Sequence, residues 1–177
     1  NKVKVLHPLE ILNGKFNEDA VRHAVKKDLS GINVACYYGC LLTRPPEIMQ
    51  FDECEYPMSM DEVLRKAGIT TLDWSCKTDC CGAAFALTRT EIVLKLVNDI
   101  LENARQVGAD AIAVACPLCH SNLDTRQEEV NKTYKTDYDF PIFYFTQLLG
   151  LAFGIEGKKL GLDRNFVGAG SLLEKVK

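Results

Sequence analysis

The stretch AIAVACPLC, residues 111–119, decides the fold of this chain. Its first six residues are apolar and partly β-branched, which predicts a buried strand over Ala111–Cys116. Pro117 suits the first turn of a helix, because the backbone N–H that proline lacks would have no partner there. The stretch therefore predicts a strand that passes directly into a helix, with Cys116 and Cys119 at the junction.

Strand-like and helical segments alternate along the rest of the chain. Further strands are predicted over Ile32–Tyr38, Ile69–Trp74 and Pro141–Phe145. Helices are predicted over Ser59–Ala67, from a capping box at Thr88–Glu91 to Gly108, from Pro117 towards Val130, and over Gln147–Phe153. Such alternation is typical of parallel sheets with right-handed crossovers. We therefore predict an α/β fold: a small doubly wound, mostly parallel four-stranded sheet with helices on both faces.

The composition is that of an ordinary globular protein. The 177 residues are 47% apolar and 25% charged, with a net charge of -3, so there is no basic excess of the nucleic-acid-binding kind. No apolar run reaches the roughly 18 residues of a membrane span, and the first residues lack a signal-peptide pattern. We expect a cytoplasmic protein with one domain over residues 31–177, preceded by a helical or linker segment over residues 1–30.

Eight cysteines are unusual in a reducing compartment unless their thiolates bind metal or carry out redox chemistry. Cys40 follows the first predicted strand, Cys80 and Cys81 follow the second, and Cys116 and Cys119 follow the third. Because the carboxyl ends of parallel strands meet at one edge, these five thiols are predicted to converge. Helix N-termini at that edge would stabilise thiolates.

The number of thiols limits what they can hold. Soft thiolate ligands favour zinc, copper(I) or an iron–sulfur cluster. Four of them satisfy a structural zinc ion or an ordinary cluster, and a fifth, supplied by the vicinal pair Cys80-Cys81, exceeds either requirement. A disulfide framework explains the vicinal pair poorly, because adjacent cysteines bond each other only with strain. The residues alone leave the three metal chemistries open.

The spacing of the five cysteines is more specific than any one motif. Thirty-nine residues separate Cys40 from Cys80, the vicinal pair is followed by Gly82, and 34 residues separate Cys81 from Cys116. This pattern resembles the cysteine-rich CCG domain of the B-type subunit of heterodisulfide reductase. The resemblance covers nearly the whole chain and includes Tyr37–Cys40, Gly108–Ile112 and Cys116–Gln127.

The resemblance implies a cofactor and partners. Such domains hold a noncubane 4Fe-4S cluster through five cysteines, which here would be Cys40, Cys80, Cys81, Cys116 and Cys119. In the parent enzyme two tandem domains cleave the disulfide of coenzyme M and coenzyme B. Electrons come from an iron–sulfur subunit and a flavin-containing subunit. The implied partners are thus a disulfide substrate, a second CCG domain and those two subunits.

The chain carries one such motif, where the parent carries two. Val3–Leu12 looks like the segment that joins the two domains of the parent, so the chain resembles its C-terminal half. We interpret it as a fragment, a split subunit or a single-domain relative. We expect it to bind a cluster and to be unable to reduce a heterodisulfide alone.

Residues outside the five-cysteine set have competing interpretations. His120 would orient a ligand or, as the catalytic residue, donate a proton to a leaving thiolate; it would equally fit an exposed helix surface. Cys36, Cys54 and Cys76 are expected to be packing thiols without a metal role. We expect structural or exposed positions for His7 and His23, solvated positions for Arg44, Lys77 and Arg89, and positions partly in the core and partly in the site wall for Tyr37 and Tyr38.

Three other functions fit part of the pattern. A thioredoxin-like oxidoreductase would use Cys116 and Cys119 but leaves the other three cysteines unexplained. A structural zinc or docking module would use four cysteines. CCG domains also occur in lactate, glycolate, glycerol-3-phosphate and succinate oxidation systems, where the cluster would relay electrons. Iron and sulfide content separates the iron–sulfur functions from the first two.

Overall fold

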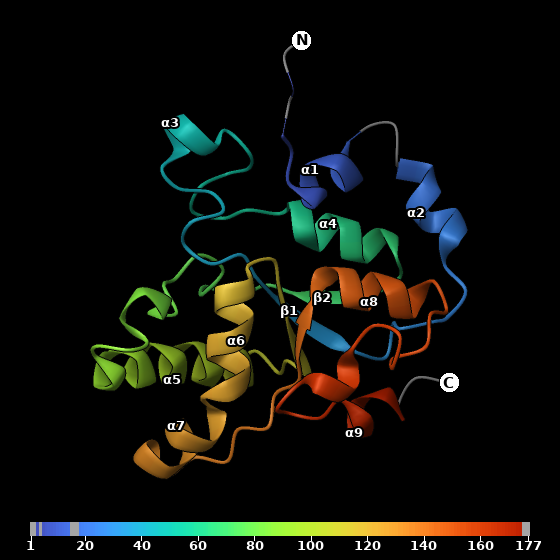
Figure 1. Cartoon of the computed structure of the whole chain (residues 1–177). Helices are drawn as coiled ribbons and strands as arrows, with labels where there is room; N and C mark the ends of the chain where they lie inside the picture. Colours follow the sequence, from blue (N-terminus) through green and yellow to red (C-terminus); the bar gives the residue numbers. More distant parts are fainter. Residues whose placement is uncertain (1–2, 4, 15–17, 175–177) are drawn as a thin grey trace.

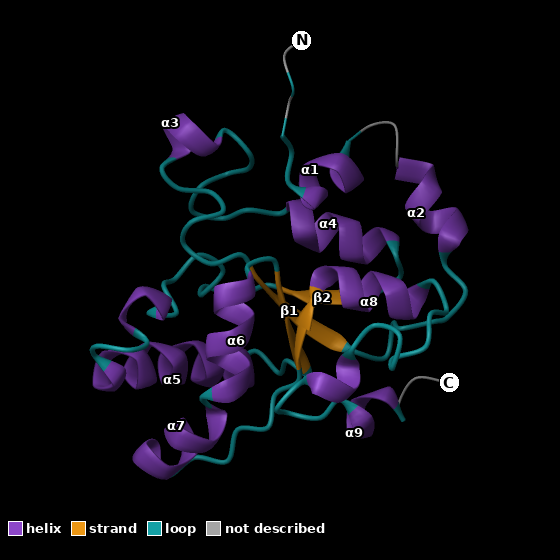
Figure 2. Ribbon diagram, viewed as in Figure 1, coloured by secondary structure: helices purple, strands orange, loops and turns teal. Residues whose placement is uncertain are grey.

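A four-stranded parallel sheet lies at the centre of the computed structural model, which describes residues 3, 5–14 and 18–174. Helices lie on both sides of this sheet (Figure 1, Figure 2). Across the sheet the strands are β2 (Thr70–Leu72), β1 (Asn33–Tyr37), β3 (Ala111–Val114) and β4 (Ile142–Tyr144). The predicted fold class is confirmed.

The two middle strands explain why the sequence revealed the sheet so clearly. In β1 and β3, Val34 pairs with Ala111, and both residues are fully buried. Strands that are covered on both faces are continuously apolar, and this is the pattern of the two segments. Each strand lies within its predicted segment and is shorter than predicted.

Two groups of helices cover the sheet (Figure 1). One group contains α1 (Pro8–Asn13), α2 (Glu18–Ala24), α4 (Ser59–Lys66) and α8 (Phe145–Ala152). The other contains α5 (Thr90–Gln106), α6 (Pro117–Thr125) and α7 (Gln127–Tyr134). The short elements are α3 (Pro46–Met49), η2 (Ala83–Phe85), η3 (Leu162–Arg164) and α9 (Gly170–Leu173). Within the described residues, no helix combines the length and the apolar character that crossing a membrane requires.

The core consists of two apolar clusters, one on each face of the sheet. Val34 and Cys36 of β1 belong to the cluster under α4 and α8, whereas Ala35 and Tyr37 belong to the cluster under α5 and α6. Successive side chains of a strand point to opposite faces, so one strand contributes to both clusters. The loop that follows β1 therefore leaves the sheet between the α4 and α8 layer and the α5 and α6 layer.

One predicted helix is two helices in the structure. The sequence predicts a helix from Pro117 towards Val130, whereas α6 ends at Thr125 and α7 begins at Gln127. The side-chain amide of Gln127 donates to the Phe140 carbonyl at 2.8 Å and accepts from the Phe140 N–H at 2.9 Å. The break thus places the Gln127 amide where it satisfies both backbone groups of Phe140, as a neighbouring strand would, just before β4 begins.

The start of α5 also differs from the prediction. The expected capping box at Thr88 is absent, since α5 begins at Thr90 and its first turn has no side-chain cap. The N–H groups of Thr88 and Arg89 bind the Phe85 carbonyl at 3.1 and 2.9 Å. Thr88 is held in the preceding turn, so the capping-box prediction is wrong.

The last predicted strand ends early. Phe145 is the first residue of α8 and not the last residue of a strand. Gln147 Oε1 accepts a hydrogen bond from the Tyr144 N–H at 2.8 Å, which closes the first turn of the helix. The chain therefore passes from β4 into α8 without a loop.

The N-terminal helices pack on the rest of the chain through α4. Both α1 and α2 contact α4, and Leu9 of α1 is fully buried. The predicted division into residues 1–30 and 31–177 stays a prediction. Residues 1, 2, 4, 15–17 and 175–177, which include parts of that division and Lys4 of the predicted joining segment, lie outside the described residues.

Candidate metal centre

Five cysteines meet at the carboxyl edge of the sheet. Cys40 lies in the loop after β1, Cys80 and Cys81 lie in the loop after β2, and Cys116 and Cys119 lie at the start of α6. All five line one cavity of about 460 Å³. The structure thus brings together the five residues that the sequence proposes as ligands, and their role as ligands stays a prediction.

The loop after β1 approaches the cavity closely. Gly39 has φ +72°, a left-handed conformation that favours glycine. A Cβ atom at this position would lie 2.8 Å from Cys119 Sγ, which is closer than a real Cβ contact. The N–H groups of Tyr38 and Gly39 donate to the Lys77 carbonyl at 2.8 and 3.2 Å, which joins the two cysteine-bearing loops.

Two thiols interact directly at the base of the cavity. Cys81 Sγ lies 3.7 Å from Cys119 Sγ, and both residues are buried. The side-chain contact with Cys119 lowers the pKa of Cys81 to about 6 in opposition to burial, with help from the Ala83 backbone and Asn122. The same contact, together with burial, raises the pKa of Cys119. Cys81 therefore carries the negative charge of this pair.

The other three thiols are less buried. Cys80 is exposed, and Cys40 and Cys116 are half-buried. Burial, and then contacts with Cys80, raise the pKa of Cys40 to about 11. Cys116 is the N-cap residue of α6, where the helix dipole favours a negative charge. The Gly82 N–H donates to Cys80 Sγ at 3.4 Å.

The residues present fit an iron–sulfur cluster by their chemistry and number. All eight cysteines of the chain lie in its described part and carry free thiols, and five of them face one cavity. Buried thiolates need a positive partner, and soft metals supply one. Gly39 leaves space beside Cys119 that any side chain would fill. Within the described residues, no three His, Cys, Asp or Glu side chains are already grouped as a metal site, so the fit rests on the number and chemistry of the five thiols and not on a preformed set of ligands.

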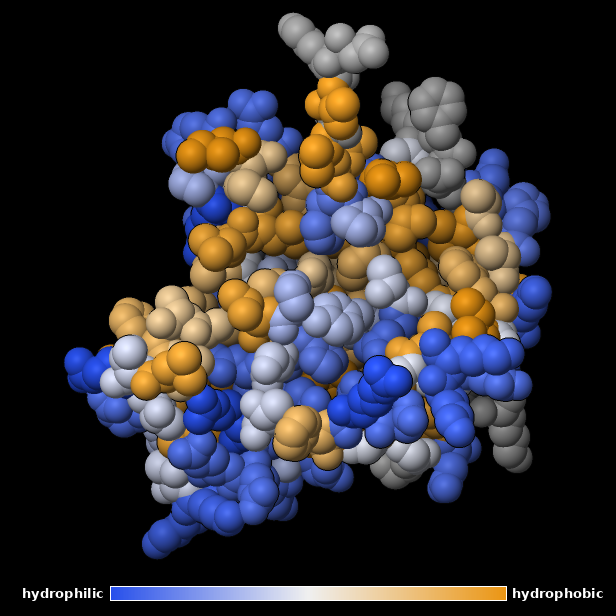
Figure 3. All heavy atoms as spheres, viewed as in Figure 1, coloured by the Kyte–Doolittle hydropathy of each residue, from blue (hydrophilic) through white to orange (hydrophobic). Residues whose placement is uncertain are grey.

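The mouth of the cavity is apolar. Leu41 and Leu118 line it and are 72% and 62% exposed, and Met49 contributes a third apolar side chain. Figure 3 shows apolar residues gathered beside a notch between the α3 segment and α6. The cavity is therefore accessible from the surface and has an apolar entrance.

His7 lines the cavity, which the sequence did not indicate. It is the N-cap residue of α1, where its Nδ1 accepts from the Leu9 N–H at 3.2 Å and its own N–H donates to Glu10 Oε2 at 2.7 Å. Burial lowers the pKa of His7. The spacing of His7 and Glu10 is that of a capping box, so it could have located the helix start, although not the cavity.

His120 does not line the cavity. Its ring stacks on Tyr144, with centroids 4.5 Å apart and planes 3° apart, and its Nε2 is buried without a hydrogen-bond partner. Burial lowers the pKa of His120. Burial, together with the charges of Cys116 and Cys119, raises the pKa of Tyr144. The catalytic role proposed for His120 stays a prediction.

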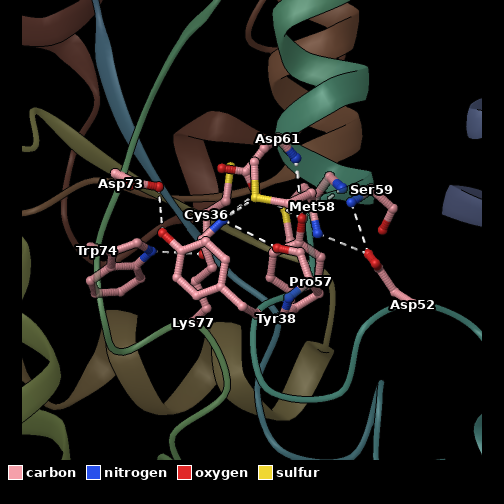
Figure 4. Close-up of polar contacts among 12 residues, drawn as sticks. Cys36, Tyr38, Asp52, Pro57, Met58, Ser59, Asp61, Asp73, Trp74 and Lys77 are labelled. Atoms are coloured by element: carbon pink, nitrogen blue, oxygen red, sulfur yellow. Dashed lines mark hydrogen bonds and ion pairs between the residues drawn. The ribbon is translucent and has the colours of Figure 1, made fainter.

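Lys77 is buried, although the sequence predicts a solvated loop residue. Its Nζ lies 2.8 Å from Asp61 Oδ2, and both side chains are fully buried (Figure 4). The Tyr38 hydroxyl donates to the same oxygen at 2.7 Å and accepts from the Met60 N–H at 2.7 Å. Lys77 Nζ also donates to the Pro57 carbonyl at 3.2 Å. The prediction for Lys77 is wrong because its partners come from the start of α4, far away in sequence.

The two arginines lie outside the cavity wall. Arg44, with 35% of its side chain exposed, pairs with Glu55 at 2.5 Å and donates to Thr78 Oγ1 at 3.0 Å. Arg89, with 59% exposed, pairs with Glu91 at 2.6 Å. Arg89 is therefore solvated as expected, whereas Arg44 braces the loop that leads to the vicinal cysteines.

The remaining cysteines do not line the cavity. Cys36 is fully buried, and its carbonyl accepts from Trp74 Nε1 at 2.9 Å. Burial raises the pKa of Cys36 and raises that of Cys76 to about 11. Cys54 is half-buried beside Glu53. That these three thiols have no metal role stays a prediction.

The adjacent tyrosines divide between the two faces of the sheet. Both are fully buried, and Tyr38 lines the cavity. The Tyr37 hydroxyl donates to the Asp79 carbonyl at 2.6 Å and so supports the loop before the vicinal cysteines. Burial raises the pKa of Tyr37. His23 is exposed, and its Nδ1 contacts the Asp19 carbonyl at 2.7 Å.

Comparison with known families and proteins gives a consistent result. The family model described as a cysteine-rich domain, CCG, matches residues 34–124. The chain is 31% identical over 175 residues to the B-type subunit of the ferredoxin:CoB-CoM heterodisulfide reductase of Methanosarcina mazei, covering 98% of this chain and 58% of that protein. It is also 31% identical over 156 residues to the 8-methylmenaquinol:fumarate reductase membrane anchor subunit of Wolinella succinogenes, covering 88% and 55%.

A solved structure shares the fold. The crystal structure of a hypothetical protein from Helicobacter pylori matches with a TM-score of 0.64 and 15% identity, over 86% of this chain and 28% of that one. At this identity the match describes the fold alone. The chain spans little more than half the length of the curated relatives it matches, as their covered shares of 58% and 55% indicate.

Proposed function

Because the chain belongs to the cysteine-rich CCG domain family, we propose that it is the iron–sulfur domain of an oxidoreductase subunit similar to the B-type subunit of heterodisulfide reductase. The convergence of five free thiols on one cavity carries this proposal. The proposed ligands of a noncubane 4Fe-4S cluster are Cys40, Cys80, Cys81, Cys116 and Cys119. Structural zinc is the alternative occupant.

The chain's own residues prepare the cavity for such a group. When bound, the cluster would supply electrons singly and an iron atom that can hold a thiolate. Asn122 Nδ2 donates to the Cys81 carbonyl at 2.6 Å and fixes the backbone of the vicinal pair. Leu41 and Leu118 surround the entrance with apolar surface, which limits water beside the sulfurs.

We propose a disulfide as the substrate, either the coenzyme M–coenzyme B heterodisulfide or a related one. Reductive cleavage consumes two electrons and two protons and releases two thiols. A site that supplies electrons singly therefore needs a second site, for which a second CCG domain is the proposed source. An iron–sulfur subunit and a flavin-containing subunit are the proposed electron donors, and a cytoplasmic location stays a prediction. The relative from Methanosarcina mazei, named as a heterodisulfide reductase subunit, supports this choice.

Metal analysis tests the proposal. Protein purified anaerobically is expected to be brown, with about four iron and four sulfide per chain. Colourless protein with one zinc ion would support a docking module instead. Colourless, metal-free protein with two redox-active thiols would support the thioredoxin-like function. Steady heterodisulfide reduction by the purified chain alone would contradict the need for a second domain.

An electron-relay function is the second candidate. The likeness to a subunit of a fumarate reductase from Wolinella succinogenes favours it, because the name of that complex includes no disulfide. The two functions differ in whether a disulfide reaches the cluster. Electron paramagnetic resonance spectra of the loaded protein, recorded with and without added heterodisulfide, separate them. A changed spectrum supports disulfide reduction, and an unchanged spectrum supports the relay.

A further inference from the structure

We infer that Cys81 and Cys119 form a reversible disulfide when the cavity holds no cluster, and that this bond decides whether the cavity accepts one. The inference rests on the proposed function and adds a redox control of cofactor loading to it. The two sulfur atoms lie 3.7 Å apart, and both side chains are buried at the cavity wall. Bond formation requires this separation to shorten to about 2 Å.

The two segments that carry the pair are already joined by a hydrogen bond. Asn122 lies three residues beyond Cys119 in α6, and its buried side-chain amide donates to the Cys81 carbonyl at 2.6 Å. On another side of Cys119 Sγ, Gly39 contributes no side chain, since a Cβ atom there would lie 2.8 Å from the sulfur. The approach of the two sulfurs is therefore expected to require movement of side chains and not of the backbone.

The sequence offers each thiol a different partner. Cys119 could pair with Cys116, as the thioredoxin-like function requires. Cys81 could pair with Cys80, but a disulfide between adjacent cysteines is strained. The observed contact instead joins two segments that are 38 residues apart in the sequence. The partner of Cys119 therefore separates this inference from the thioredoxin-like function.

The oxidant in this proposal is a small organic disulfide, which enters the cavity of about 460 Å³ that both cysteines line. One thiolate of the pair attacks a sulfur of that molecule and releases a first small thiolate. The second thiol of the pair then attacks the mixed disulfide and releases another. The two protons of the pair go to the released thiolates, so two protein thiols and one small disulfide become one protein disulfide and two small thiols.

The protein disulfide withdraws two of the five proposed ligands. A cavity with three free thiols has fewer than the four that an ordinary iron–sulfur cluster requires. Reduction by a thiol reverses the exchange and returns both ligands. The pair would thus prevent cluster loading under oxidising conditions and permit it under reducing ones.

Peptide mapping can identify the bond, because trypsin separates the two segments. Residues 78–89 hold the vicinal pair, and residues 106–126 hold Cys116 and Cys119. The metal-free chain is reduced, freed of reductant and exposed to 2-hydroxyethyl disulfide without oxygen. Remaining thiols are blocked with N-ethylmaleimide before digestion. The wild type should lose two of its eight free thiols and yield the two peptides linked to each other.

Three serine variants assign the linked peptides to one pair of thiols. Cys119→Ser should lose the link, whereas Cys116→Ser, its matched control in the same peptide, should keep it. Cys80→Ser should also keep the link, which leaves Cys81 as the second partner. Thermal melting of each metal-free variant shows that the chain is folded.

Metal binding tests the consequence for loading. Cadmium is a suitable probe because it is a soft metal with a thiolate absorption band, whereas sulfide would itself reduce the bond. The oxidised wild type should bind much less cadmium than the reduced chain. Reduction of the same sample should restore cadmium binding, and reconstitution with iron and sulfide should then succeed.

Three results would overturn the inference. The first is a wild type that keeps all eight thiols, and the second is a disulfide confined to one of the two peptides. The third is equal cadmium binding by the oxidised and reduced chains. If the reduced chain takes up no iron and sulfide, the proposed function fails, and the linked peptides still decide whether Cys81 and Cys119 form the bond.

Discussion

Two groups of polar side chains lie near the end of β1, and they differ in whether their interaction partners come from the chain itself. The buried cluster of Lys77, Asp61 and Tyr38 finds its partners within the chain, apart from Asp61 Oδ1, which has no hydrogen-bond partner. The cysteine cavity is lined by five thiols, and its two buried ones, Cys81 and Cys119, contact each other. The first group stabilises the fold, whereas the second offers thiol ligands to a bound metal or cluster.

Tyr38 connects the two groups. Its hydroxyl belongs to the buried cluster, whereas its N–H and that of Gly39 bind the Lys77 carbonyl beside the cavity. The buried cluster therefore fixes the loops on which Cys40 and Cys80 lie. Changes in the cluster should cost stability, and changes among the cysteines should cost metal binding.

Removing the buried ammonium group should have the largest effect on stability. Lys77→Met leaves the Asp61 carboxylate buried without its charge partner, and we expect a loss of about 3–5 kcal/mol in the free energy of unfolding. Urea denaturation measures this loss. The double variant with Asp61→Asn removes the charge and should recover more than half of it. A Lys95→Met control, in an exposed pair with Asp99, should change little.

Equal stability of the single and double variants at Lys77 and Asp61 would contradict this account. It would mean that the loss comes from packing and not from an unpaired charge.

Adding a methyl group at Gly39 should have the next largest effect. Gly39→Ala places a Cβ in the left-handed region, which costs about 1–2 kcal/mol, and pushes it against Cys119 Sγ. Gly108→Ala is the matched control, because its φ is +75° and nothing lies within 4 Å of the added atom. Both variants should lose stability in urea denaturation, with the larger loss in Gly39→Ala. Only Gly39→Ala should lose iron. Equal iron contents in Gly39→Ala and Gly108→Ala would show that the space beside Cys119 Sγ is not needed for metal binding.

Arg44 should contribute less. Arg44→Ala removes a partly exposed pair with Glu55 and the hydrogen bond to Thr78, and we expect a loss of about 1 kcal/mol or less. Denaturation with and without added salt measures it, because salt screens exposed pairs. Arg89→Ala, in a more exposed pair, is expected to change stability still less. If Arg44→Ala lost as much unfolding free energy as Lys77→Met, the partly exposed pair of Arg44 would matter as much as the buried cluster, which would contradict this expectation.

Cys80→Ser should have the smallest effect on stability and a large effect on metal content. Cys80→Ser changes an exposed residue, so the free energy of unfolding should stay within about 0.5 kcal/mol. Its iron and sulfide content after reconstitution should fall well below that of the wild type. Cys54→Ser, outside the cavity, should keep the full content. Full iron content in Cys80→Ser would remove Cys80 from the proposed ligand set.

The sequence predicts the sheet and the gathering of the cysteines because both depend on local patterns. Continuous apolar runs mark β1 and β3, and strand topology brings the residues after them to one edge. The burial of Lys77 depends on Asp61 of α4, and the position of His7 in the wall depends on the packing of α1 on α4; no local sequence pattern reports either contact. The break before Gln127 was missed for the same reason, since its partner is the backbone of Phe140.

The exposed position of Cys80 has a consequence for the order in which the holoprotein is made. The ion pair and hydrogen bonds of the Lys77 and Asp61 side chains involve none of the five cysteines, and Cys80 is the exposed thiol of the cavity wall. Delivery of the proposed cluster is therefore expected to follow folding, with Cys80 as the first proposed ligand that an incoming cluster donor meets. The exposed Cys80 would then bind the incoming cluster first, and the buried Cys81 and Cys119 would bind it last.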